Sequence, residues 1–257
     1  DPRGVLLSSI LAKKKSVGAQ NVIIDIPIGR GTKIPSMVDA QDLAQDFLKI
    51  GGKLGMNVEA LITDGSEPIG NGIGPGLEAR DVMQVLEGDG PEDLRHKSLI
   101  VAGKLIEMSG KIEKGRGYQA AEHFLDSGKA LEKMREIIEL QGGNGKVKSD
   151  DIEIAKYKHD VKCEKGGKIN HIDNKTISKI AKIAGAPVDK GAGVFIYRQK
   201  GDRVDTGDLL FSIYAESEAK LDFAIKALEN LEPIEMQKIL LEMVRRSGSE
   251  ASDEPSS

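Results

Sequence analysis

A short glycine-containing loop carries the residues best suited to chemistry in this chain of 257 residues. Ile28-Gly29-Arg30-Gly31-Thr32-Lys33 brings together two glycines, a hydroxyl and two cations. Glycines let backbone N–H groups approach an anion closely, and Arg30 and Lys33 add positive charge, so the loop is suited to a phosphate group. An ordinary turn with a solvated arginine and lysine is the alternative that the local sequence leaves open.

A second candidate is the pair Ser9 and Lys13, which are four residues apart in a helical segment. Residues at this spacing lie on one helix face, so both side chains can reach the same polar ligand. Such pairs are also common on solvated helices, and the spacing by itself predicts no particular ligand.

Other residues that often do chemistry lack a supporting pattern. Gly72-x-Gly74-x-Gly76 does not have the spacing of the dinucleotide fingerprint, so we expect a loop shaped by glycine beside a ligand instead. The single Cys163 is read as a buried apolar filler. The four histidines, His96, His123, His159 and His171, are scattered and read as structural or surface residues; no metal site is predicted.

The elements that must position these residues alternate as in an α/β domain. Asn21–Pro27 and Met56–Thr63 are short apolar runs typical of buried parallel strands, and each is followed by a glycine-containing loop. Because ligands collect at the carboxyl ends of such strands, both loops belong to the predicted site. Helical patterns cover Gly4–Ser16, Val38–Leu54, Leu77–Leu86, Pro91–Ser109 and Ala120–Gln141.

A flexible polar stretch, Gly142–Asp151, predicts a domain boundary. We therefore expect an α/β domain over residues 1–145, an α+β domain over residues 146–246 and a disordered tail over residues 247–257. In the second domain we expect strands around Val161 and Val194–Tyr197, and helices over Lys175–Ala184 and Ser217–Leu228, with a last segment to Val244. A turn within Lys200–Leu210 joins two further strands that bury Val204, Leu209, Phe211 and Ile213.

Composition excludes several classes of protein. Hydrophobic residues make up 39% of the chain, and no apolar run approaches the length of a membrane span. With 37 Lys+Arg against 41 Asp+Glu the net charge is −4, which argues against a nucleic-acid partner. One cysteine permits no internal disulfide, so we expect a cytoplasmic protein.

Several motifs together resemble the pyrimidine and thymidine phosphorylase family. They are Ser9-x-x-x-Lys13-Lys14, the strand Asn21–Pro27 with its glycine loop, Ile62-Thr63-Asp64-Gly65-x-x-Pro68-x-Gly70, His171-Ile172-Asp173-Asn174-Lys175 and Asp189-Lys190-Gly191-Ala192-Gly193. The likeness runs from Asp1 to about Leu228. Within the family, Asp1-Pro2-Arg3-Gly4 and Gly29–Lys33 look most like the archaeal AMP phosphorylase branch.

The resemblance implies reversible phosphorolysis of AMP, in which adenine and ribose 1,5-bisphosphate form without a cofactor and inorganic phosphate is the co-substrate. It implies that Asp1 donates the proton to the leaving base, that Ser9 and Lys33 bind the nucleotide and that Lys13 binds the base. CMP and UMP are further candidate substrates. It also implies a homo-oligomer and a C-terminal domain with a barrel-sandwich element.

Two features of the family do not occur here, an N-terminal helical domain and a phosphate-binding loop of Lys-x-Ser/Thr-Gly-Gly character. The chain is therefore expected to be the C-terminal half of a longer enzyme and to lack turnover alone. Two alternatives remain open: a pyrimidine nucleoside phosphorylase acting on thymidine or uridine, and a non-catalytic assembly module.

Overall fold

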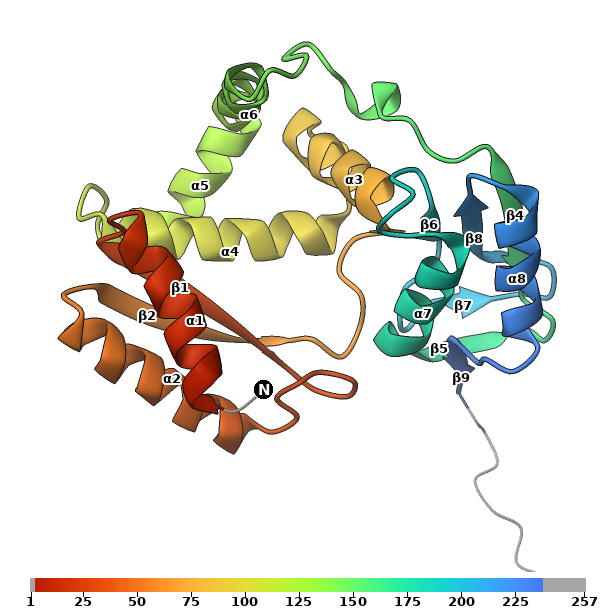
Figure 1. The fold of residues 1–257 in the computed structure, drawn as a ribbon, viewed down its shortest axis with the longest axis horizontal. Helices are drawn as coiled ribbons and strands as arrows, with labels where there is room; N and C mark the ends of the chain where they lie inside the picture. Colours follow the sequence, from red (N-terminus) through yellow and green to blue (C-terminus); the bar gives the residue numbers. More distant parts are fainter. Residues whose placement is uncertain (1–2, 238–257) are drawn as a thin grey trace, which may run out of the picture.

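The computed structural model describes residues 3–237. Asp1, the end of the expected last segment at Val244 and the expected disordered tail over residues 247–257 lie outside the described residues. Within them the chain is a mixed α/β structure with three sheets (Figure 1).

The first part of the chain is built around a two-stranded parallel sheet. Its elements are α1 (Arg3–Ser16), β1 (Asn21–Ile28), α2 (Met37–Lys53) and β2 (Asn57–Asp64), which agrees with the sequence prediction to within two residues. The strands pair in register from Asn21 with Asn57 to Ile28 with Asp64, so both end at one edge. The core of this part joins α1, β1, α2 and β2, with Leu11 and Phe47 each 1% exposed.

The expectation that β1 is buried on both faces was wrong. Val22, Ile24 and Ile26 are buried, whereas Asp25 and Pro27, on either side of Ile26, are exposed. α1 and α2 share the core of the buried face. On the other face Asp25 pairs with Lys97 of α4, at 2.7 Å between Oδ2 and Nζ.

Four helices follow: α3 (Pro75–Glu87), α4 (Glu92–Met108), α5 (Gly117–Asp126) and α6 (Lys129–Leu140). A single helix over Ala120–Gln141 was expected, and this was wrong. Gly128 adopts a φ of 79°, a left-handed conformation that ends α5 and starts α6 in a new direction. α6 buries none of its residues.

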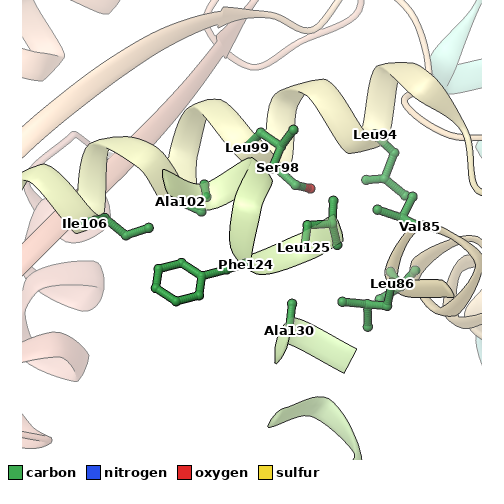
Figure 2. A pocket seen from close by; sticks show the side chains of 12 residues that line it. Val85, Leu86, Leu94, Ser98, Leu99, Ala102, Ile106, Phe124, Leu125 and Ala130 are labelled. Atoms are coloured by element: carbon green, nitrogen blue, oxygen red, sulfur yellow. The ribbon is translucent and has the colours of Figure 1, made fainter. Parts of the chain in front are cut away.

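A cavity of about 250 Å³ lies among these helices, and Figure 2 shows the side chains that line it. Its lining is apolar except for Ser98. A cavity with one hydroxyl has no group to transfer a proton or to bind a charge, so the chemistry must lie elsewhere.

The later part contains a short 3-10 helix over Ser149–Asp151, two helices and two antiparallel sheets. The helices are α7 (Asn174–Ala184) and α8 (Glu218–Leu228). One sheet has the order β3-β6-β8-β4, formed by Gly72–Ile73, Gly193–Ile196, Leu209–Ala215 and Tyr157–Lys162. The other has the order β7-β5-β9, formed by Arg203–Val204, Gly167–Ile172 and Ile234–Met236.

The two strands expected around the turn within Lys200–Leu210 exist, but each pairs elsewhere. β7 pairs with β5, and β8 pairs with β4 and β6. Val204, Phe211 and Ile213 are buried as expected, whereas Leu209 is only half-buried and Leu210 takes the buried place beside it. β8 is a central strand with both faces covered, so it cannot be the arm of an isolated hairpin.

The two parts of the chain have separate hydrophobic cores, and the loop after β2 connects them. One core belongs to α1, β1, α2 and β2, and the other to the sheets and helices after Tyr157. β3, within the loop after β2, pairs with β6 and so joins the later sheet. No helix among residues 3–237 is long and apolar enough to cross a membrane.

Candidate active site

The candidate site lies where β1 and β2 end and their loops begin. Because the strands are parallel and in register, the loops after Ile28 and Asp64 leave the sheet side by side, and Gly65 N donates to Ile28 O at 2.8 Å. A Cβ on Gly65 would lie 2.7 Å from Pro27 Cβ and 2.9 Å from Thr32 Cγ2, so only glycine permits this approach.

The loop after β1 is folded tightly by its own backbone. Gly29 and Gly31 have φ values of 123° and 84°, and Thr32 Oγ1 donates to Gly29 O and to Ile34 O, both at 2.8 Å. These contacts hold the peptide groups between Gly29 and Ile34 in one shape. Lys33 is exposed at the end of this turn.

A cavity of about 400 Å³ opens beside this loop. It is lined by Leu6 and Ile10 of α1, Leu43 and Phe47 of α2, Ile24, Asp25, Ile26 and Pro27 of β1, and Gly31, Thr32, Lys33, Ile34 and Gly65 of the loops. A largely apolar wall with a lysine at one side suits a ligand with a flat apolar part and an anionic part. The beginning of α1 lies at this end of the sheet (Figure 1), and a helix N-terminus favours negative charge.

The predicted site residues are distributed unevenly around this cavity. Lys33 lies on its wall. Ser9 and Lys13 are exposed on α1, next to the lining residue Ile10, but do not line the cavity themselves. Asp1 lies outside the described residues.

Arg30 has a different role from the one considered at the level of sequence, where it was a second cation for a phosphate or a solvated side chain. Its guanidinium donates to both carboxylate oxygens of Glu235 in β9, at 3.0 Å and 2.5 Å. The ion pair lowers the pKa of Glu235, chiefly through this hydrogen bond. Among the described residues, Lys33 is therefore the one cation of this loop that lines the cavity.

Sequence reasoning missed a polar group at the same end of the sheet. Asp25 accepts from Thr63 Oγ1 at 2.7 Å and pairs with Lys97, whose Nζ lies 3.1 Å from the threonine hydroxyl. Asp25 lines the cavity. The missed signal was a charged residue within the apolar run of β1, which calls for a partner from another element.

The last glycines of the loop Asp64–Gly76, Gly74 and Gly76, pack against protein backbone. A Cβ on Gly74, whose φ is 131°, would lie 2.3 Å from Ala192 O, and one on Gly76 would lie 2.9 Å from Lys190 O. They follow β3, a two-residue antiparallel strand, and not a parallel strand as a dinucleotide site requires. In the structure the close neighbours of Gly74 and Gly76 are backbone atoms around Ala192 and Lys190, and the packing of this loop beside a ligand stays a prediction.

Two carboxylates of this loop region illustrate its electrostatics. Asp64 accepts from Ser66 N at 2.9 Å, and this hydrogen bond lowers the pKa of Asp64. Asp81 of α3 is 2% exposed and accepts from Asn71 N and Gly72 N through Oδ2, while its Oδ1 is buried without a partner. Burial raises the pKa of Asp81. In residues 3–237 no group of three or more His, Cys, Asp or Glu side chains is placed to hold a metal ion.

Comparison with known proteins shows what the sequence is similar to. Residues 168–235 match the pyrimidine nucleoside phosphorylase C-terminal domain. The chain is 48% identical over 95% of its length to AMP phosphorylase of Methanosarcina acetivorans, and 46% identical over the same share to that of Pyrococcus furiosus. It covers 48% and 49% of these relatives, so the chain spans about half their length. Almost the whole chain is thus similar to one half of archaeal AMP phosphorylases, and its residues 168–235 match the C-terminal domain of pyrimidine nucleoside phosphorylases.

Proposed function

We propose that the intact protein catalyses the reversible phosphorolysis of AMP to adenine and ribose 1,5-bisphosphate. The observation that carries the proposal is the 44–48% identity of almost the whole chain to proteins named AMP phosphorylase. The cation on the wall of a largely apolar cavity supports it, because such a site accommodates both a base and a phosphate.

In this proposal Lys33 binds the 5′-phosphate. A lysine beside glycine-rich backbone favours a dianion over an uncharged hydroxyl, which separates a nucleotide substrate from a nucleoside. Ser9, exposed on α1, binds the substrate from the neighbouring helix, and Lys13 on the same helix face contacts the base.

The proposed reaction breaks the N-glycosidic bond between the base and C1′ of the ribose. An oxygen of inorganic phosphate forms the new bond to C1′, and the electron pair of the broken bond leaves with adenine. Asp1 gives the base its proton, so the departing group is neutral. No cofactor takes part, and inorganic phosphate is the co-substrate.

The remaining assignments are proposals of the same kind. We place the domain boundary near Gly145, supported by the separate cores on either side of it. The C-terminal domain contains a barrel-sandwich element, and the enzyme is a cytoplasmic homo-oligomer. CMP and UMP are further candidate substrates.

The test uses the full-length protein and measures base release from AMP, adenosine, uridine and thymidine, with and without inorganic phosphate. Phosphate-dependent release of adenine from AMP is expected. Release only from uridine or thymidine would instead support a pyrimidine nucleoside phosphorylase, and no release from any substrate would support an assembly module.

A substitution of Lys33 tests its proposed role separately. We expect Lys33→Ala to raise KM for AMP by about 10- to 100-fold, the value of a charge-assisted hydrogen bond, with little effect on adenosine. Lys111→Ala, which removes an exposed lysine in the loop after α4, is the control. An unchanged KM for AMP in Lys33→Ala would remove this lysine from the phosphate site.

A further inference from the structure

The loop that carries Lys33 is fastened to a strand far away in the sequence. Arg30 lies three residues before Lys33, and its guanidinium binds Glu235 of β9 through two parallel hydrogen bonds. A bidentate pair fixes the orientation of both side chains, which a single ionic contact does not. The side chain of Glu235 is 31% exposed, so the contact lies at the surface. Its two hydrogen bonds give the contact one well-defined geometry.

The second loop of the site is fastened to the same pair of strands. Glu67 accepts from His171 Nδ1 at 2.6 Å and from Ile172 N at 2.7 Å, both at the end of β5. Asn174, the first residue of α7, donates through Nδ2 to Gly65 O at 2.8 Å. Glu235 and His171 are partners in the β5–β9 ladder, so both loops are held by neighbouring residues of one ladder.

The shape of the first loop does not require Arg30. Its tight turn is formed by Gly29, Gly31 and the Thr32 hydroxyl, all within the loop. The contact with Glu235 instead fixes the position of this loop relative to the rest of the site. Because Lys33 follows in the same short turn, its position depends on that contact.

We propose that Glu235 is a positioning residue: by holding Arg30 it fixes the loop that carries Lys33 and so sets the preference for a 5′-phosphorylated substrate over the nucleoside. This inference rests on the proposed function. It assigns to β9, outside the cavity, a part in substrate specificity.

A rival role for Arg30 predicts the opposite sign. If Arg30 binds the 5′-phosphate itself, Glu235 competes with the substrate for the guanidinium. Removing the negative charge of Glu235 would then strengthen AMP binding. If Glu235 positions the loop, the same substitution weakens AMP binding.

The experiment measures kcat and KM for AMP and for adenosine, with saturating inorganic phosphate, in the full-length protein. Glu235→Gln is expected to raise KM for AMP about three- to fivefold, as for the loss of a well-formed surface ion pair, with kcat within about twofold. The kinetic constants for adenosine stay unchanged. Arg30→Ala gives the same change, and the double variant is no worse than either single one, because both remove one contact.

Two further variants separate positioning from general damage. Exchanging the charges, Arg30→Glu with Glu235→Arg, restores part of the lost affinity for AMP. Asp126→Asn, which breaks the exposed Arg95–Asp126 pair at 2.8 Å between α4 and α5, leaves KM for AMP unchanged.

The inference is overturned if Glu235→Gln lowers KM for AMP, leaves it unchanged, or alters AMP and adenosine equally. A wild-type enzyme that releases no adenine from AMP refutes the proposed function, and this inference with it. If the wild-type enzyme releases adenine from AMP and Glu235→Gln leaves KM for AMP unchanged, only the positioning role is refuted.

Discussion

Single residues in this structure show how burial decides the cost of a charge. Asp81 is almost fully buried, and one of its carboxylate oxygens has no hydrogen-bond partner. Two backbone N–H groups stabilise the ionised form, but desolvation outweighs them and the pKa of Asp81 is raised. Arg30 and Glu235 show the opposite case, in which two half-exposed charges retain water and gain a defined geometry.

The raised pKa of Asp81 predicts a pH dependence of stability. The folded state retains the proton to a higher pH than the unfolded chain, so the free energy of unfolding falls as pH rises from about 4 through the raised pKa. Asp81→Asn keeps an oxygen that can accept from Asn71 N and Gly72 N but does not titrate. Denaturant unfolding of both chains between pH 4.5 and 7 should show the wild type losing stability relative to the variant as pH rises. Parallel curves would contradict a raised pKa.

At the scale of elements, close backbone contacts fix how the loop after β2 meets the later sheet. Gly74 combines a φ of 131° with a contact to Ala192 O that no side chain could tolerate. This contact lies next to the pairing of β3 with β6. At Gly74 the loop therefore meets the later sheet through backbone contact, whereas the side chains of Glu67 and Asn174 hold its beginning to the end of β5 and the start of α7.

Two glycine substitutions separate the cost of strain from the cost of a clash. Gly88 has a φ of 96° with open space around it, so Gly88→Ala is expected to cost about 1 kcal/mol from strain alone. Gly74→Ala adds the clash with Ala192 O and should cost at least about 2 kcal/mol more. Free energies of unfolding from urea titration compare the two; equal costs would show that the segment around Ala192 moves aside freely.

At the scale of the whole molecule, two cores are joined by a loop and by polar contacts. Among residues 3–237 none belongs to both core clusters. The contacts between Arg30 and Glu235 and between Glu67 and His171 cross from one part to the other. Cooperative units of unfolding usually follow such cores.

Hydrogen exchange should therefore resolve separate openings in this chain. Amides of β1 and α2 are expected to share one opening free energy, and amides of α7 and β8 another. Amides of α6 should exchange faster than those of α2 and α7, because α6 buries none of its residues. Native-state exchange at increasing denaturant measures this; a single opening shared by both cores would show one cooperative unit.

Local patterns in the sequence determined most of the elements. α1, β1, α2 and β2, with α3, α4, α7 and α8, follow from apolar periodicity and glycine punctuation, which depend on neighbours in the chain. β3 and β9, with two and three residues, are too short to show a period, and β5 carries polar residues among its apolar ones. The break at Gly128 was missed because an isolated glycine within a helical pattern is often tolerated.

The sequence alone also carried the resemblance to the pyrimidine and thymidine phosphorylase family, through motifs spread from Ser9 to Gly193, and singled out the loop that carries Lys33. Only the tertiary structure decided the partners of charged residues. Arg30 and Glu235 are 205 residues apart in the sequence, and Glu67 and His171 are 104 residues apart. No local pattern relates positions so far from each other. Pairing between strands and between distant charges depends on which elements pack together, and packing is a property of the whole chain.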